Sequence, residues 1–238
     1  MSGALRRALV RHASAPYRPA GRGAWHFARG KLGGDPLFAA LACDGLLPAE
    51  GRYLDLGCGQ GLLASWLRAA TALHGDGGWP GELAPPPRIA AYHGLDLRPA
   101  AIGQARLALA GSPFPIRLEV GDLRGCPLPE ADVVTLFDVL HYLPDDAQEN
   151  LLRRIRRHLP AHGRLLLRIG DADAGLPHHM SRCVDSIVVA ARSGTWPRLH
   201  CRPLAAWQAL LADLGFRVEA RPLAGAGLAD VLLSAVPA

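Results

Sequence analysis

The sequence predicts an α/β protein built on a doubly wound sheet of seven strands, with helices on both faces. Three observations carry this prediction. Short apolar segments alternate with longer segments whose apolar residues recur at helical spacing. A glycine-rich turn follows the first apolar segment directly. The last two apolar segments follow each other with no helix between them, which is typical of a closing antiparallel pair.

Each element is assigned from apolar spacing and from its end signals. Pro99 opens a helix because its fixed φ suits the first helical turn. Asp145 and Asp146 suit the positive end of the helix that starts at Pro144. Strands are expected at 53–57, 89–97, 116–122, 131–140, 163–171, 216–222 and 229–236, and helices at 35–47, 61–73, 99–110, from 144, around 179–191 and at 204–214.

The positive charge lies at the start of the chain. The 238 residues have a net charge of +5, but residues 1–34 hold seven of the 26 basic residues and no acidic residue. The rest of the chain has a net charge of −2. We expect a basic N-terminal arm and lid segment over 1–34, the arm a free, solvated tail, and a single domain over 35–238. A nucleic-acid groove is disfavoured, because it would spread Arg and Lys over the folded body.

Lysine and cysteine usage excludes several classes of protein. Lys31 is the only lysine, and Leu32 follows it, so the chain has no P-loop. The Tyr/Lys relay of short-chain dehydrogenases is missing, since Phe27 precedes Lys31 by four residues. The five cysteines form no C-x-x-C pair, which favours a reducing, cytoplasmic location over a disulfide framework. The acid-free start also suits a transit peptide, although a cytoplasmic arm is the preferred interpretation. No apolar run is long enough for an integral membrane segment.

The stretch DLGCGQG at 55–61 is the clearest candidate for a ligand-binding loop. Its glycines let a ligand approach the backbone where a Cβ would collide. Asp55 argues against a dinucleotide, because its carboxylate would repel a pyrophosphate. It favours a ligand that carries positive charge, such as S-adenosylmethionine, which has an ammonium, a sulfonium and no phosphate.

At this point the sequence resembles the class I S-adenosylmethionine-dependent methyltransferases. DLGCGQG matches their first motif, and GLDL, GDL and FDVLHYLP follow in order over about residues 50–170. The resemblance implies a Rossmann-like methyltransferase sheet with an antiparallel last strand and S-adenosyl-L-methionine as cofactor. It implies that Asp96 binds the ribose hydroxyls of the cofactor and that Asp122 accepts from its adenine amino group. Either residue could instead be a helix cap or turn residue. The implied cofactor-binding residues are Asp55, Gly57, Gly59, Gly61, Asp96, Leu97, Asp122, Leu123 and Asp138.

The acceptor side is expected after the fourth strand. His141 lies at the carboxyl end of that strand and is the candidate general base for a hydroxyl acceptor, the alternative being a packing role. The segment 25–36 combines aromatic and cationic groups with glycines and is a candidate lid. Arg29 or Lys31 in that segment could pair with the carboxylate of the cofactor.

The domain is expected to consist of a cofactor-binding half (50–171), a helical cap insertion (172–203) and a C-terminal helix with a strand pair (204–238). Apolar residues recur at helical spacing in the insertion: Met180, Val184, Ile187 and Val188. They could form a cap over an aromatic or acyl substrate, or they could pack on the sheet. His178, His179, His200 and Cys201 lack the spacing of a known zinc site, so no metal is expected.

The acceptor is expected to be a small molecule. Asp138–His141 stands where DNA amino-methyltransferases carry an Asn- or Asp-Pro-Pro-aromatic motif, which disfavours nucleic acid. GKLGGDPLF, DLGCGQGLL, DVLHYL and LHCRPL together resemble small methyltransferases of bacterial aryl-polyene or polyketide pigment clusters. That resemblance implies an aromatic hydroxyl or ring, or a carrier-bound acyl intermediate of secondary metabolism, as acceptor. The basic arm could then meet an acidic acyl carrier protein, or an anionic membrane surface. The alternatives are a nicotinamide-dependent oxidoreductase on the same fold and a non-catalytic S-adenosylmethionine-binding protein.

Overall fold

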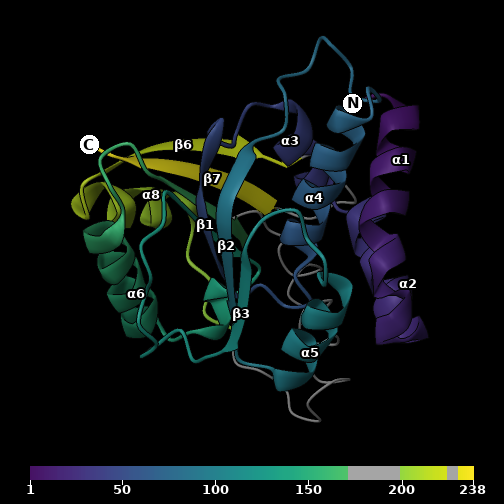
Figure 1. Cartoon of the computed structure of the whole chain (residues 1–238). Helices are drawn as coiled ribbons and strands as arrows, with labels where there is room; N and C mark the ends of the chain where they lie inside the picture. Colours follow the sequence, from purple (N-terminus) through teal and green to yellow (C-terminus); the bar gives the residue numbers. More distant parts are fainter. Residues whose placement is uncertain (171–198, 224–229) are drawn as a thin grey trace. The chain divides into compact units, whose positions relative to one another are not determined.

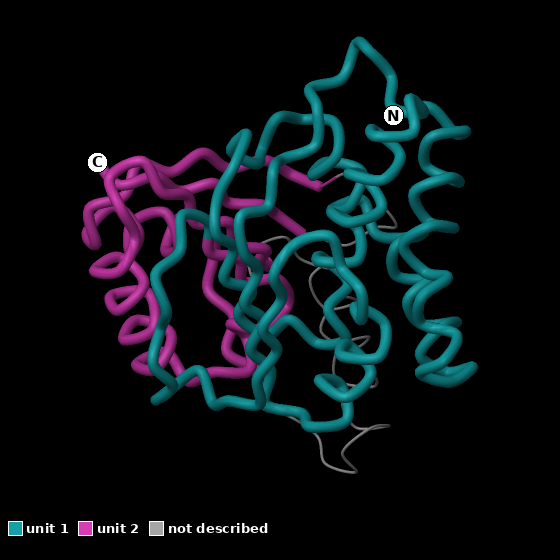
Figure 2. The backbone as a smooth tube through the Cα atoms, viewed as in Figure 1, with its two compact units in different colours: residues 1–133 teal, residues 134–238 magenta. Residues whose placement is uncertain are grey.

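The computed structural model describes residues 1–170, 199–223 and 230–238. The chain divides into two compact units, residues 1–133 and 134–238, which Figure 2 shows in different colours. Most of the predicted cap insertion, with its helix at 179–191, lies outside the described residues.

Unit 1 starts with helices and continues with alternating strands and helices (Figure 1). β2 pairs in parallel with β1 on one side and with β3 on the other. The elements are α1 (Gly3–Ser14), η1 (Ala15–Ala20), α2 (Arg22–Gly34), α3 (Pro36–Cys43), β1 (Glu50–Leu56), α4 (Leu62–Gly75), β2 (Arg88–Asp96), α5 (Pro99–Ala108) and β3 (Ile116–Val120).

Residues 1–34 are folded, so the expectation of a free, solvated tail is wrong. Ser2 caps α1, because its side chain accepts a hydrogen bond of 3.2 Å from the Leu5 N–H. α1 and α2 run beside α4 (Figure 1), and their inward side chains share one apolar cluster with that helix. The cluster contains Leu5, Leu9, Ala13, Tyr17, Ala28, Leu32, Phe38, Leu62, Trp66, Ala69, Ala70, Leu73 and Ala108. The arginines lie on the opposite faces of α1 and α2, exposed.

Unit 2 contains β4 (Val133–Phe137), whose first residue closes unit 1, and η2 (Leu140–Tyr142), α6 (Asp145–His158), β5 (Arg164–Gly170), α8 (Leu204–Asp213), β6 (Phe216–Pro222) and β7 (Asp230–Pro237). The predicted stripe of α6 is buried, with Leu151, Leu152 and Ile155 turned inward. Within residues 1–170, 199–223 and 230–238, no helix has the length and apolar character needed to cross a membrane.

The strand order β3-β2-β1-β4-β5-β7-β6 confirms the predicted α/β fold with a doubly wound sheet. β7 is antiparallel to β5 and to β6, with Leu167 opposite Leu233 and Val218 opposite Ala235. The predicted antiparallel last strand is thereby confirmed.

Two expected elements differ most from the observed ones. The strand expected over 131–140 ends at Phe137, because Asp138 takes a left-handed conformation (φ 58°) that turns the chain out of the strand. The helix expected over 35–47 ends at Cys43, before the left-handed Gly45 (φ 62°). Its start is confirmed, since the Asp35 side chain accepts a hydrogen bond of 2.9 Å from the Leu37 N–H.

Candidate functional site

The glycine-rich loop between β1 and α4 requires its glycines. Gly57, Gly59 and Gly61 all have left-handed φ angles, of 82°, 56° and 73°, which side chains rarely allow. At Gly61 space is also lacking, since a Cβ there would lie 2.7 Å from Cδ1 of Leu109. The loop therefore has a shape that this part of the sequence adopts only with glycine.

Most backbone N–H groups of this loop are bound by the protein itself. Leu95 O accepts from the N–H groups of Gly57 and Cys58 at 2.7 and 2.9 Å. The Gly61 N–H donates to Cys58 O at 2.9 Å. The Gly59 N–H donates to Oδ2 of Asp96 at 2.8 Å. These N–H groups are consequently not aimed at a phosphate, as they would be in a phosphate-binding loop.

Asp96 joins this loop to the end of β2, as the motif predicts. Its side chain is buried, and Oδ1 accepts hydrogen bonds from the Arg98 N–H (2.9 Å) and Nε (3.1 Å). The Arg98 side chain is half-exposed, so it can turn away at small cost. Leu97 is 64% exposed, which is unusual for a large apolar residue at the end of a buried strand.

Asp55 lies buried at the end of β1 and accepts a hydrogen bond from the hydroxyl of Tyr92 on β2. Burial, with Asp55 beside it, raises the pKa of Tyr92, so that this hydroxyl stays protonated and donates. Cys58 is also buried, packed against Gly94, and burial raises the pKa of its thiol. A thiol with a raised pKa is a poor nucleophile, which agrees with a packing role for Cys58.

Asp122 and Leu123 follow β3. Asp122 is partly exposed and is bound by Arg124, whose guanidinium lies 2.6 Å from Oδ2. This hydrogen bond lowers the pKa of Asp122. Leu123 is buried. The two residues thus give a charged and an apolar group side by side, at the end of the strand where the sequence predicts adenine recognition.

The predicted lid segment, 25–36, is helical over most of its length, within α2. Lys31 forms an ion pair of 3.0 Å with Asp35, one turn further along. The guanidinium of Arg29 lies over the ring of Trp25, 5.7 Å from its centroid. Ala28 and Leu32 on the other face are buried. Movement of this segment stays a prediction.

Within unit 2, Asp138 and Arg168 form a close ion pair between the end of β4 and β5. Asp138 is the one non-glycine residue with positive φ among the residues that the structure describes. Arg168 is only 4% exposed and holds both carboxylate oxygens of Asp138. This pair fixes the turn that leads to His141.

His141 lies in η2, and its ring packs edge-on against that of Tyr142 with centroids 4.2 Å apart. Its carbonyl accepts a hydrogen bond of 2.8 Å from the His200 N–H. The buried side chain of Gln148 ties the same two segments together, since its Nε2 donates to Leu140 O at 3.1 Å and to His200 O at 2.9 Å. His178 and His179, considered for a metal site with His200, lie outside the described residues.

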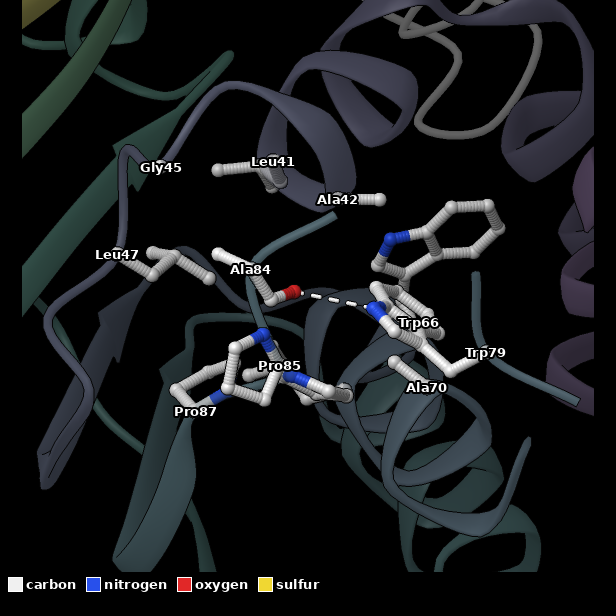
Figure 3. A pocket seen from close by; sticks show the side chains of 12 residues that line it. Leu41, Ala42, Gly45, Leu47, Trp66, Ala70, Trp79, Ala84, Pro85 and Pro87 are labelled. Carbon is white, nitrogen blue, oxygen red and sulfur yellow. Dashed lines mark hydrogen bonds between the residues drawn. The ribbon is translucent and has the colours of Figure 1, made fainter. Parts of the chain in front are cut away.

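Unit 1 also has an apolar pocket between α3, α4 and the loop that follows α4 (Figure 3). Its lining includes Leu41, Trp66, Trp79 and Pro85, and Trp79 Nε1 donates to Ala84 O at 3.0 Å. The lining has no acid, base or nucleophile, so this pocket is not the chemical site.

A family model described as a methyltransferase domain matches residues 54–165, from β1 to the start of β5. The chain resembles this family over the matched stretch. This stretch, called the methyltransferase domain below, contains the glycine-rich loop, Asp96, Asp122 and His141. No curated protein sequence matches the chain.

Several solved structures are similar to the chain around this methyltransferase domain. Human N-acetylserotonin methyltransferase in complex with S-adenosylmethionine is 20% identical, with a TM-score of 0.61 over 95% of this chain and 57% of its own. An O-methyltransferase family protein from Burkholderia thailandensis is 20% identical, with a TM-score of 0.63 over 91% and 59%. An O-methyltransferase family 2 protein from Planctomyces limnophilus, in complex with apigenin, is 19% identical, with a TM-score of 0.60 over 98% and 65%. The chain thus spans less than two thirds of the length of these proteins, and the likeness shows the fold.

Four residues around the methyltransferase domain escape the sequence analysis: Tyr17, Tyr92, Gln148 and Arg168. Tyr92 and Arg168 stand in apolar strands, where nothing marks them as partners of Asp55 and Asp138. Gln148 lies on the buried stripe of α6, and a polar residue on such a stripe is a usable signal. Tyr17 had a signal too, because it continues the four-residue spacing of Leu5, Leu9 and Ala13.

Proposed function

We propose that this protein transfers a methyl group from S-adenosylmethionine to a small-molecule acceptor. The observation that carries the proposal is the glycine-rich loop of the methyltransferase domain, bonded through the Gly59 N–H to the buried carboxylate of Asp96. When bound, S-adenosylmethionine supplies a methyl group on a positively charged sulfur, which an acceptor atom displaces in line.

The residues of unit 1 fit this cofactor better than a dinucleotide. A pyrophosphate needs free N–H groups, but those of Gly57, Cys58, Gly59 and Gly61 already have acceptors within the protein. The buried carboxylate of Asp55 adds negative charge, which favours a cationic ligand. This disfavours the alternative of a nicotinamide-dependent oxidoreductase.

Five of the predicted cofactor residues have a definite task in this proposal. Asp96 accepts from the ribose hydroxyls after Arg98 turns away, and Asp122 accepts from the adenine amino group. The exposed side chain of Leu97 and the buried one of Leu123 give apolar contact to the adenine ring. Lys31 pairs with the cofactor carboxylate, for which it would exchange its ion pair with Asp35.

His141 is the proposed general base for a hydroxyl acceptor. Its backbone position is fixed on both sides, by the Asp138–Arg168 pair before it and by the hydrogen bond from His200. A fixed imidazole can accept the acceptor proton as methyl transfer occurs, which contributes about 10²- to 10⁴-fold in such reactions. Packing against Tyr142 is the competing role for the ring.

Two acceptor classes belong to the proposal: an aromatic hydroxyl or ring, and a carrier-bound acyl intermediate of secondary metabolism. The similarity to an O-methyltransferase in complex with apigenin supports the first. The exposed arginines Arg6, Arg7 and Arg11 support the second, since they would suit an acidic carrier protein. The likeness to pigment-cluster enzymes and the cytoplasmic location stay predictions.

The test is calorimetric titration with S-adenosylmethionine and its demethylated product, followed by incubation with methyl-labelled cofactor and an extract of the native host. We expect micromolar binding and one labelled product, whose structure identifies the acceptor. Absence of binding at millimolar ligand would refute the proposal, and a response to NADH would favour the oxidoreductase. Binding without transfer to any acceptor would favour a non-catalytic S-adenosylmethionine-binding protein.

A further inference from the structure

Tyr17 connects the N-terminal helices directly to the glycine-rich loop. It lies in η1, between α1 and α2, and is fully buried. Its hydroxyl donates a hydrogen bond of 2.8 Å to the carbonyl oxygen of Gln60. Gln60 stands between Gly59 and Gly61, so a side chain from the first twenty residues holds the centre of the predicted cofactor loop.

Two hydrogen bonds fix the peptide group between Gln60 and Gly61, one on each side. The carbonyl of Gln60 and the N–H of Gly61 belong to the same planar peptide group. Tyr17 binds the oxygen of that group, and the N–H donates to Cys58 O at 2.9 Å. Because flanking glycines have little intrinsic preference for one conformation, a peptide between them depends on such outside contacts.

Burial keeps Tyr17 in the role of donor. Removal from water raises the pKa of Tyr17 well above its ordinary value, so the hydroxyl stays protonated. The ring packs in the cluster shared by α1 and α4, which prevents the hydroxyl from turning to solvent.

A second hydrogen bond stabilises the same N-terminal helices away from the loop. The Ser2 side chain caps α1 by accepting from the Leu5 N–H at 3.2 Å. This bond acts within α1, whereas the Tyr17 bond reaches the loop. Ser65 on α4 offers no such comparison, because its side chain is hydrogen-bonded to Tyr17 and its N–H donates to Gly61 O at 3.0 Å.

We propose that Tyr17 is a positioning residue for cofactor binding, and that α1, η1 and α2 are for this reason part of the cofactor site. The proposal rests on the proposed function, because it takes the glycine-rich loop as the S-adenosylmethionine loop. Tyr17 acts through the loop backbone and needs no contact with the cofactor. It limits the loop to the conformation that binds, so its loss lowers affinity.

The experiment compares the full chain with Tyr17→Phe and with Ser2→Ala. Tyr17→Phe keeps the ring and removes only the hydroxyl, and Ser2→Ala removes the cap of α1. For each protein we would measure the Kd of S-adenosylmethionine, the melting temperature and the amide hydrogen exchange of residues 57–61 without ligand. A methyl-transfer assay adds kcat and the KM for S-adenosylmethionine.

We expect Tyr17→Phe to raise the Kd and the KM about three- to tenfold, as the loss of one buried hydrogen bond allows, and to leave kcat within about twofold. Exchange in residues 57–61 should become faster. Ser2→Ala should lower the melting temperature, because loss of a helix cap destabilises the helix, and should leave the Kd and the loop exchange near those of the wild type. If Tyr17→Phe fails to fold, Tyr17→Met replaces it in the same comparison.

An unchanged Kd together with unchanged loop exchange in Tyr17→Phe would overturn the proposal. An equal rise of the Kd in both variants would also overturn it, because it would show that Tyr17 acts only through the general packing of the helices. If the wild type binds no S-adenosylmethionine, the proposed function fails, and the hydrogen exchange of residues 57–61 alone tests whether Tyr17 positions the loop. Faster exchange in Tyr17→Phe but not in Ser2→Ala would then still support positioning of the loop, and equal exchange would reject it.

Discussion

The Gly59 N–H and the Asp96 carboxylate are joined by a hydrogen bond of 2.8 Å, which links the turn after β1 to the end of β2. The same carboxylate is bound by Arg98 on its other oxygen. Asp96 is therefore both part of the loop scaffold and a candidate ligand for the ribose. A substitution there should affect the loop and the cofactor together.

Asp96→Ala should raise the Kd for S-adenosylmethionine about 10- to 100-fold, because a hydrogen bond to a charged group contributes about 1.5–3 kcal/mol. Titration calorimetry measures this. Asp76→Ala, at an exposed carboxylate beyond α4, is the control and should bind as the wild type does. Equal affinities for all three proteins would remove Asp96 from the site.

Gly61→Ala should lower the free energy of unfolding by about 1–3 kcal/mol more than Gly111→Ala, which is the cost typical of overpacking. Both glycines are left-handed, with φ of 73° and 70°, but only at Gly61 would a Cβ collide, with Leu109. Urea denaturation of both variants measures the difference. A difference near zero would show that conformation alone requires glycine at 61.

His141→Ala should lower kcat for a hydroxyl acceptor by about 10²- to 10⁴-fold, the usual range for a lost general base. The Kd for S-adenosylmethionine should stay as in the wild type. His162→Ala, at an exposed histidine, should change neither. A parallel loss of affinity and turnover in His141→Ala would instead point to the packing role.

Arg124→Ala should raise the pKa of Asp122 toward its ordinary value, because the guanidinium of Arg124 holds it down. A lowered pKa means that the pair stabilises the fold above the ordinary pKa of Asp, and that this contribution is lost as the pH falls below it. The effect on stability is small, since the pair is exposed and screened by solvent. Carboxyl NMR titration measures it, with Arg117→Ala, which acts on Glu119, as control. An unchanged Asp122 titration would contradict the assignment.

Gln148→Leu should lower the free energy of unfolding by about 1–3 kcal/mol, because buried carbonyls lose their donor. It should also lower methyl transfer, since Gln148 joins the His141 turn to residues 199–202. Thermal melting and the transfer assay measure the two effects. Gln208→Leu, on the less buried side of α8, is the control. Full activity in Gln148→Leu would show that the turn keeps its shape without this amide.

The fold could be predicted because its signals are local. β1, β2 and β5 are short apolar runs, and α6 has one apolar stripe. Pro99 and Asp35 begin the helices where the sequence analysis placed them. The residues of the glycine-rich loop could be predicted from their motif, because the left-handed φ angles of the loop backbone require glycine at fixed positions in the sequence.

The rest depends on contacts between distant residues. The many basic residues of 1–34 suggested a solvated arm. In the structure the basic residues of α1 and α2 lie on the outward faces of these helices. The inward faces pack on α4 through Leu5, Leu9 and Tyr17. The partner of a buried polar group, such as Tyr92 for Asp55, is set by strand register, which pairs Tyr53 with Tyr92 and is invisible along the chain.

Because Arg7 and Arg11 of α1 lie on the face opposite its buried leucines, charge and packing can be changed separately in this helix. Reversal of Arg7 and Arg11 to glutamate would turn a cationic surface into an anionic one without touching the apolar cluster. Arg6 is kept, because its guanidinium donates to Gly33 O on α2. The helix can therefore exchange one set of charged partners for another while its inner face continues to support the loop.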